Sequence, residues 1–363
     1  MNIKTLGVKT QRSIEQFWEW MKVQYRLYAE DKVMEVGIKG TNELTEEEKQ
    51  QVKAFYKPYF KAKLTSHQFY KEKTGEFHVD YIPDYIWYGY IDPYYNDWKL
   101  DKYIDNKCYY SRMFPDVDQP ETILVRLNGY WLDKNNSIIS LDSAKEIINN
   151  SRSPLFLKMA GSYFGCGGGV AFYNPLDREM EKLDPFFSSR EDLMVQAAIK
   201  QHSSLEQINK SSVNTYRLLS MLKKDGSVQI LSSVLRMGRN GKKVDNEASG
   251  GLSCGINDDG SLKSVAYSKY GDRFTEHPDS HVVFEGYHVP SYENVREIVV
   301  KNHPLIPHFR MVSWDIAVDE NGLPLLIEIN TAYGGLSLHQ LNNGPIFGDE
   351  TKEILDEVFK KRI

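Results

Sequence analysis

The stretch 312-VSWDIAVDENGLPLLIEINTAYGG-335 decides how the rest of the sequence is interpreted. Two apolar runs flank the polar turn 319-DENG-322, and this pattern predicts a β-hairpin. Asp315 lies in the first run, whereas Glu328 and Asn330 lie in the second. Residues two apart in a strand point to the same face of a sheet, so Glu328 and Asn330 project together. Asp315 is expected across the hairpin from them.

These three side chains would supply hard oxygen ligands. Mg2+ prefers few protein ligands and leaves the rest of its octahedron to phosphates and water. An uncompensated carboxylate between apolar strands is costly, so a bound cation is one explanation. The alternative is that Asp315 and Glu328 pair with nearby Arg or Lys side chains. The glycine- and asparagine-rich segment 331–349 follows the second strand directly, as active-site loops often do, and favours the metal interpretation.

The remaining periodicities predict the fold class. Apolar residues recur at three- and four-residue steps in 12–30 and 44–62, which predicts helices, the second with Thr45 as its N-cap. Apolar runs separated by turn residues predict hairpins at 213–238 and 250–268. Helices come first, and hairpins with inserted helices follow. This order predicts an α+β fold with a large mixed sheet.

Further local predictions concern the segments between these elements. The aromatic segment 81–98, which contains two prolines, is predicted to be loop rather than helix or strand. Two strands are expected in 121–141, around the turn 133–137. Asp142 and Ser291 are expected to be the N-caps of the helices that follow them.

Composition narrows the function classes. The net charge of −5 over 363 residues gives no reason to expect nucleic acid as a partner. No run of about 18 apolar residues occurs, and the first 20 residues lack the apolar stretch of a signal peptide, so no membrane span is expected. Cys108, Cys166 and Cys254 show no metal-type spacing, which favours a reduced, cytoplasmic setting. The 23 tyrosines and 6 tryptophans suit either packing between domains or sugar stacking.

A second motif is typical of phosphate-binding sites. Lys158 precedes the glycine-rich segment 161-GSYFGCGGGV-170. Glycines let backbone N–H groups approach a polyphosphate, and a lysine supplies positive charge. The lysine comes before the glycines, so the segment is not a Walker A motif. The alternative is a hairpin with a glycine turn and a surface lysine.

Together, the acidic hairpin and several other segments resemble the ATP-grasp superfamily. The hairpin is similar to the metal-binding end of that fold, where an Asp on one strand and a Glu-x-Asn on the next hold magnesium. The closest resemblance is to the sugar-transfer-associated branch, which is linked to surface-polysaccharide biosynthesis. It extends from residue 105 to residue 345 and includes the segments 107–123, 156–170, 194–205, 211–222 and 243–256.

The resemblance implies an architecture and cofactors. Two α+β subdomains would clasp ATP, preceded by a helical, aromatic-rich N-terminal region at 1–110. The lid subdomain, with the lysine and the glycine-rich loop, would occupy 111–205, and the subdomain with the metal site would occupy 206–363. ATP and one or two Mg2+ ions are the expected cofactors, with Asp315, Glu328 and Asn330 as metal ligands.

The resemblance also implies roles for individual residues. Nucleotide contacts are expected from Lys158, Gly161, Gly165, Gly167, Gly168, Gly169, Gln196, Ala197, Ile199, His202 and Asn214, with Gln201 as an alternative to His202 at the ribose. The alternative for His202 is an ordinary surface histidine. Lys158 and Arg217 are the expected catalytic cations, because a guanidinium fork matches phosphate geometry.

Many ligases of the superfamily have an arginine two residues before the metal-binding Asp, where this chain has Ser313. Arg217 is therefore a replacement candidate, and the other candidates are Arg236, Arg239 and Arg310. The alternative for Arg217 is a structural pair with a carboxylate. Asp245, Asn246, Gly250 and Gly251 are expected at the mouth of the site, in contact with substrate or phosphate.

The implied activity is a Mg-ATP-dependent carboxylate–amine ligase that works through an acyl-phosphate. By analogy with the branch, it would add an amino acid or amine to a uronic acid or other sugar of a capsule or lipopolysaccharide, beside other polysaccharide-synthesis enzymes. One alternative is a kinase that phosphorylates a hydroxyl, with Asp245 or His202 as the base. Another is a scaffold protein that binds ATP without turnover. The sequence leaves the substrates and the oligomeric state open.

Overall fold

The chain divides into two compact units. The computed structural model describes residues 21, 23–25, 27–160, 169–332 and 334–360. The first unit, here the helical unit, comprises Met1–Tyr94, Tyr270–Asp272 and Leu336–Ile363. The second, here the sheet unit, comprises Tyr95–Lys269 and Arg273–Gly335. The boundaries expected at residues 110 and 205 both fall inside the sheet unit.

The helical unit joins the two ends of the sequence. Residues 27–37 are helical, and the unit also contains α2 (Glu46–Tyr56), α3 (Thr65–Thr74), α4 (Asp84–Ile86), the π-helix η1 (Trp87–Ile91), α12 (Ser337–Asn343), η8 (Gly348–Glu350) and α13 (Thr351–Lys360). Thr45 caps α2 as predicted: its hydroxyl accepts from Glu48 N, and the Glu48 carboxylate accepts from Thr45 N in a capping box. The helix expected over 12–30 lies largely outside the described residues.

The aromatic segment is helical, so its prediction as loop is wrong. Residues 84–95 form α4, η1 and α5 (Asp92–Tyr95) in succession. The reason is tertiary, because Ile86, Trp87 and Ile91 are buried in the unit's core. The side chain of Gln340 on α12 hydrogen-bonds both the N–H and the C=O of Ile82, each at 2.9 Å. This pair of hydrogen bonds ties the C-terminal helices to the aromatic segment.

The sheet unit contains a six-stranded sheet in the order β3-β2-β1-β6-β4-β5. Its strands are β1 (Thr122–Leu127), β2 (Tyr130–Asp133), β3 (Ile138–Ile139), β4 (Leu155–Ala160), β5 (Val170–Tyr173) and β6 (Asp192–Ala197). Its helices are α6 (Trp98–Ile104), η2 (Lys107–Tyr109), α7 (Tyr110–Met113), α8 (Leu141–Asn149), η4 (Pro175–Asp177), η5 (Met180–Leu183) and α9 (Asp184–Ser188). The core of this sheet includes Leu124, Leu157 and Val195, packed with Ala144 and Ile148 of α8.

One local prediction in this part is incomplete and another is wrong. The turn predicted at 133–137 is present and joins β2 to β3, but a further turn at Asn128 and Gly129 joins β1 to β2; both residues have positive φ, 48° and 84°. Asn-Gly tolerates this backbone conformation and suits a two-residue hairpin. Ser140, not Asp142, caps α8, since its hydroxyl accepts from Ser143 N at 3.1 Å.

A seven-stranded sheet follows, in the order β11-β10-β9-β8-β7-β12-β13. Its strands are β7 (Thr215–Leu222), β8 (Val228–Met237), β9 (Leu252–Ile256), β10 (Leu262–Ser268), β11 (Arg273–Phe274), β12 (Met311–Val318) and β13 (Pro324–Asn330). The α10 helix (Ser203–Ile208) precedes it, and η6 (Glu247–Ser249), α11 (Tyr292–Asn302) and η7 (His303–Leu305) are inserted. The three predicted hairpins are present as β7–β8, β9–β10 and β12–β13.

The α+β prediction is confirmed, but the expectation of a mixed sheet is wrong. Every strand pair among the described residues is antiparallel. Tight turns between successive strands enforce this arrangement in the hairpins, whereas β7 and β12 pair after a long connection. Ser291 precedes α11 with a φ of 56° and makes no side-chain cap; its hydroxyl instead donates to Gly322 O at 2.7 Å.

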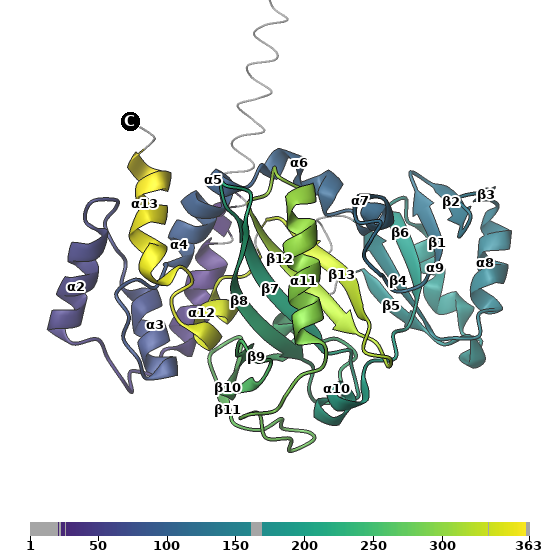
Figure 1. Cartoon of the computed structure of the whole chain (residues 1–363). Coiled ribbons are helices and arrows are strands. Elements are labelled where there is room, and N and C mark those ends of the chain that lie inside the picture. Colours follow the sequence, from purple (N-terminus) through teal and green to yellow (C-terminus); the bar gives the residue numbers. More distant parts are fainter. Residues whose placement is uncertain (1–20, 22, 26, 161–168, 333, 361–363) are drawn as a thin grey trace, which may run out of the picture. The chain divides into compact units, whose positions relative to one another are not determined.

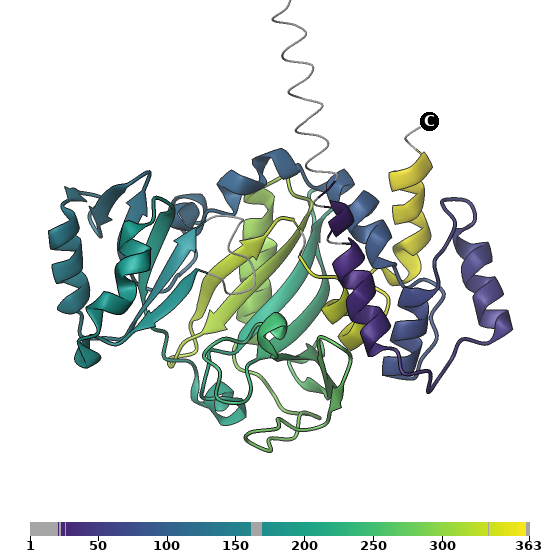
Figure 2. The ribbon, with the colours of Figure 1, turned by 180° about the vertical axis from the view of Figure 1, so that it is seen from behind.

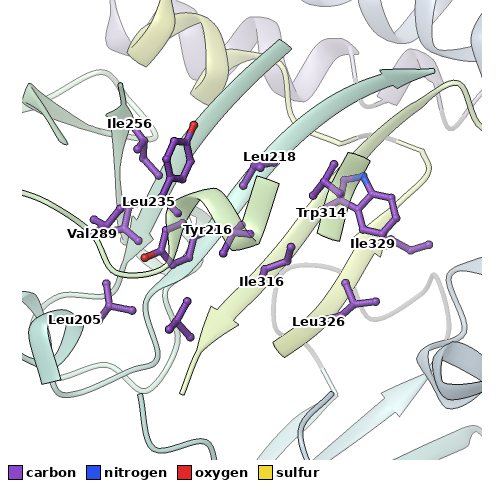
Figure 3. Packing of buried hydrophobic residues seen from close by; sticks show 14 of the residues in the cluster. Leu205, Tyr216, Leu218, Leu235, Ile256, Val289, Trp314, Ile316, Leu326 and Ile329 are labelled. Atoms are coloured by element: carbon purple, nitrogen blue, oxygen red, sulfur yellow. The ribbon is translucent and has the colours of Figure 1, made fainter. Parts of the chain in front are cut away.

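The two faces of the seven-stranded sheet differ in character. On one face, Tyr216, Leu235, Trp314, Ile316 and Ile329 form a continuous buried cluster (Figure 3). The α11 helix lies against this face, in front of β7 in Figure 1 and behind the sheet in Figure 2. Successive side chains of a strand alternate between faces. The residues between these apolar ones must therefore point to the opposite face, and they include the charged residues of the candidate site.

Candidate functional site

A row of charged residues crosses three neighbouring strands. Asp315 on β12 lies directly opposite Arg217 on β7 and directly opposite Glu328 on β13. Ser313 lies opposite Asn330 in the same register. Directly paired residues of antiparallel strands point to the same face. The register thus brings Asp315, Glu328 and Asn330 to one face of the sheet, here called the polar face.

Asp315 is held by two arginines. Arg217 donates from Nε to Oδ1 at 2.6 Å and from Nη2 to Oδ2 at 2.5 Å, and Arg236 on β8 donates from Nη1 to Oδ2 at 2.9 Å. The Asp315 side chain is only 5% exposed. Burial alone would raise the pKa of this carboxyl, but Arg217 and Arg236 hold it below its usual value. Asp315 is therefore an ionised, fully paired carboxylate.

Glu328 is paired with a lysine from a distant part of the chain. Lys107 Nζ on η2 lies 3.2 Å from Glu328 Oε1. Burial alone would lower the pKa of Lys107, but Glu328 and Asp105 hold it above its usual value. Asp105 lies close by; burial raises the pKa of its carboxyl to about 7, and the charges of Glu328 and Asp101 add to the effect. This corner of the site thus holds one lysine among three acids.

Lys158 of the six-stranded sheet belongs to the same electrostatic neighbourhood. Its Nζ donates to Gln196 Oε1 at 2.9 Å. Burial, together with repulsion from Lys107, lowers the pKa of Lys158 to about 8, although Glu328 opposes the shift. Lys158 therefore carries a readily lost proton beside the row of charged residues. Gly161, Gly165, Gly167 and Gly168 lie outside the described residues, whereas Gly169 has a φ of 81° and accepts from Met159 N at 2.8 Å.

The connector between the two sheets is tightly hydrogen-bonded. Gln196 holds Lys158, and the Ala197 N–H already donates to Glu121 O at 2.9 Å. Ile199 is half-buried. The predicted adenine contacts would therefore depend on backbone groups other than the Ala197 N–H.

His202 and Asn214 have structural roles. His202 Nδ1 accepts from Ser204 N at 3.3 Å and thereby caps α10. Asn214 is fully buried, and its Nδ2 donates to Leu205 O at 2.8 Å and to Asn209 O at 3.0 Å. The Gln201 amide donates to Asn209 O and to Ser212 O. This network fixes the chain between the connector and β7.

The turn 245–251 lies at the edge of the polar face. Asp245 accepts a hydrogen bond from the Thr215 hydroxyl, and its Oδ1 lies 3.6 Å from Arg236 Nη2. Asn246 O accepts from Gly251 N at 3.1 Å, and Gly250 has a φ of 96°. A Cβ on Gly251 would lie 2.2 Å from Asp245 O, so only glycine permits this close approach.

Two functional candidates were missed by sequence reasoning. Lys107 begins the first family-like segment, but no local pattern indicates that it reaches Glu328. Glu247 was also missed; it accepts from the Ser253 hydroxyl at 2.7 Å, and burial raises the pKa of its carboxyl. Lys107 reaches the site through a contact between segments that are far apart in the sequence. Glu247 lies in a turn whose shape cannot be read from the local sequence.

The four candidate arginines divide into two pairs. Arg217 and Arg236 both lie on the polar face, against Asp315. Arg239 lies over the Phe274 ring and donates to Gly250 O. Arg310 lies over the Tyr95 ring and donates to Leu222 O. Only Arg217 and Arg236 of these four arginines therefore hold the buried carboxylate.

The donor set on the polar face fits magnesium delivered with a nucleotide. Asp315 and Glu328 offer carboxylates, and Asn330 donates from Nδ2 to Ser313 O at 3.4 Å, which leaves its Oδ1 as the ligating atom. Within the described residues, no group of three or more His, Cys, Asp or Glu side chains could hold a metal by itself. A site with two carboxylates and one amide needs phosphate and water oxygens to complete an octahedron, as Mg2+ sites commonly do.

No helix in the described part of the chain is both long and apolar enough to cross a membrane.

Comparison with known proteins gives one family match. Residues 183–355 match the family model described as sugar-transfer associated ATP-grasp. This range contains Arg217, Arg236, the turn 245–251 and the three candidate metal ligands. A search of curated proteins found no match to the sequence.

Several solved enzyme structures show distant similarity. N5-carboxyaminoimidazole synthetase from Staphylococcus aureus complexed with ADP is 11% identical, with a TM-score of 0.36 over 63% of this chain and 45% of that chain. Biotin carboxylase from Campylobacter jejuni is 12% identical, with a TM-score of 0.40 over 71% and 46%. D-alanine–D-alanine ligase from Bacillus anthracis complexed with ATP is 12% identical, with a TM-score of 0.35 over 71% and 66%. The chain spans less than half the length of the first two proteins.

Proposed function

We propose that this chain, whose residues 183–355 match the model of the sugar-transfer associated ATP-grasp family, is an ATP-dependent carboxylate–amine ligase. Its substrates would be a sugar or other small molecule with a carboxylate, such as a uronic acid, and an amino acid or amine. The product would be an amide that enters surface-polysaccharide synthesis. The family's association with sugar transfer supports this substrate class.

The observation that carries the proposal is the composition of the polar face. Asp315, Glu328 and Asn330 share one face of the sheet, with Arg217 and Arg236 beside them and with Lys107 and Lys158 within electrostatic reach of Glu328. Carboxylates and cations side by side suit a magnesium–polyphosphate ligand, which needs both. We assign nucleotide binding to Lys158 and the glycine-rich segment, and metal binding to the three oxygen ligands.

The chemistry follows from these assignments. Mg2+, when bound, would neutralise phosphate charge and align the γ-phosphate with the attacking carboxylate. Arg217 and Lys158 would stabilise the charge that develops on the transferred phosphoryl group, which yields an acyl-phosphate and ADP. The amine then attacks the acyl carbon, and inorganic phosphate leaves. Positioning and charge stabilisation suffice for this route, which requires no protein nucleophile.

The turn 245–251 is our candidate for the substrate side of the site. Asp245 is joined to the polar face through Thr215 and Arg236, and Asn246, Gly250 and Gly251 shape the turn next to it. An acid at this position suits the recognition of an amine or of sugar hydroxyls. We assign substrate contact to this turn.

The function is tested by product analysis with [γ-32P]ATP. The full chain is incubated with Mg2+, uronic acids and amino acids, chosen first by a thermal-shift screen, because a true ligand stabilises the fold. Labelled inorganic phosphate that appears together with an amide supports the ligase. A stable labelled sugar indicates a kinase, and ATP binding without turnover indicates a scaffold; either result overturns the ligase assignment.

A further inference from the structure

We infer that the cationic side chains that pair with Asp315 and Glu328 prevent a metal ion from binding to these two carboxylates until a polyanion binds the cations instead. The metal ion and the nucleotide would therefore bind interdependently rather than independently. The inference rests on the proposed function for the identity of the polyanion, ATP. It concerns how the binding of the metal ion depends on the binding of the nucleotide, which the assignment of the metal-binding residues does not specify.

The contacts around the two carboxylates carry the inference. Both oxygens of Asp315 accept from Arg217, at 2.6 and 2.5 Å, and Oδ2 also accepts from Arg236 at 2.9 Å. Glu328 Oε1 lies 3.2 Å from Lys107 Nζ. A metal ion that coordinates Asp315 must compete for oxygens that already accept three hydrogen bonds. A metal ion that coordinates Glu328 must approach the ammonium group of Lys107.

The cations in contact with the two carboxylates make the competition unfavourable for a metal ion alone. The two carboxylates face three contacting cations, and Lys158 is close enough for Lys107 to lower its pKa. The Asp315 and Arg236 side chains are 5% and 7% exposed, so solvent screens their charges poorly. A divalent cation at Asp315 or Glu328 would therefore lie close to the charges of Arg217, Arg236 or Lys107, although Asp245 also pairs with Arg236 and Asp105 lies near Lys107.

A polyphosphate changes this balance. Its oxygens offer new partners to Arg236 and Lys107, and a guanidinium fork matches phosphate geometry at least as well as it matches a carboxylate. Once these cations move to the phosphates, Glu328 loses Lys107 and Asp315 keeps Arg217 but loses Arg236, so a metal ion meets less competition at both carboxylates. Each ligand thus raises the affinity of the other, and thermodynamic linkage makes the two effects equal.

Removal of one cationic side chain should strengthen the binding of a metal ion and weaken the binding of ATP. Arg236→Gln takes away a competitor at Asp315 while Arg217 still pairs both oxygens. We expect this variant to bind a metal ion alone about tenfold more tightly than the wild type does. It should also bind ATP without metal more weakly. Lys107→Gln should behave in the same way through Glu328. A substitution that merely damages the fold would weaken both ligands together.

The experiment measures the two ligands separately on the full chain. Mn2+ replaces Mg2+, and its binding without nucleotide is followed by loss of the electron paramagnetic resonance signal of the hydrated ion. ATP binding is measured by calorimetry in excess EDTA. Arg296→Gln is the matched control, because Arg296 lies on α11 and pairs with Asp258 at the surface. Thermal unfolding confirms that each variant is folded.

The outcomes separate this inference from the proposed function. Weak Mn2+ binding by the wild type and the control, tighter binding by Arg236→Gln or Lys107→Gln, and ATP binding in EDTA by the wild type support the inference. Equal Mn2+ affinity in the wild type and both folded variants overturns it while ATP binding stands. If the wild type binds no ATP either with or without Mn2+, the proposed function fails and the inference fails with it.

Discussion

Arg217 and Asp315 form a two-point ion pair across β7 and β12, with both hydrogen bonds no longer than 2.6 Å, although the residues are 98 positions apart in the sequence. The pair joins the fifth and sixth strands of the seven-stranded sheet, and Arg236 adds a third contact to the same carboxylate. The arrangement links the stability of the sheet to the candidate metal site. Substitutions at Asp315 should therefore affect both.

Asp315→Asn should lower the free energy of unfolding by about 3–5 kcal/mol, because it removes the carboxylate that Arg217 and Arg236 share and leaves Arg236 with the 3.6 Å ion pair to Asp245. Urea denaturation of the full chain, followed by circular dichroism, measures the change. Asp258→Asn is the control, since Asp258 is fully exposed and pairs with Arg296 at the surface. A loss for Asp315→Asn no larger than that of the control would contradict a stabilising role for the buried pair.

Glu328→Gln should separate activity from stability. Its side chain is 33% exposed and faces one lysine, so the fold should tolerate the loss of charge. ATP turnover should fall on the order of a hundredfold, as for other groups that offset charge in a transition state. A phosphate-release assay checks the activity, and thermal unfolding checks the stability. Glu320→Gln, in the exposed turn of the same hairpin, should leave turnover unchanged.

Lys158 should make ATP affinity depend on pH. Burial lowers its pKa from 10.5 to about 8 in the ligand-free protein, so the ammonium loses its proton as pH rises through that value. Phosphate oxygens favour the charged form, and ATP affinity should therefore fall as pH rises through about 8. Calorimetric titrations across this range measure the trend. Lys158→Arg keeps the charge at every pH and should remove the decline; an unchanged profile in that variant would exclude Lys158 as its source.

Gly251→Ala should displace the turn 245–251. The added Cβ would lie 2.2 Å from Asp245 O and 2.9 Å from Met237 O, so the backbone must move. We expect a loss of stability of about 1–3 kcal/mol and a loss of turnover with the substrates identified by product analysis. Gly89→Ala is the matched control, because an added Cβ there meets no atom within 4 Å. Equal behaviour of the two variants would show that the close approach at Gly251 is unimportant.

Local sequence signals predicted the hairpins well. The turns 223–227, 258–260 and 319–322 each separate two apolar runs, and the strands β7–β8, β9–β10 and β12–β13 form around them. The Asn-Gly turn at 128–129 carried an equally strong signal that was overlooked. The aromatic segment 81–98 was mistaken for loop because its helices depend on burial in the helical unit rather than on local propensity.

By itself, the sequence determined that Asp315, Glu328 and Asn330 share one face, because a hairpin register and the two-residue period of a strand are local properties. Only the tertiary structure decided which cations meet them. Lys107 and Glu328 are 221 positions apart, and β12 pairs with β7 only after a long connection. Contacts of that kind arise when separate segments bury their apolar faces together, and no local periodicity encodes which charged side chains then become neighbours.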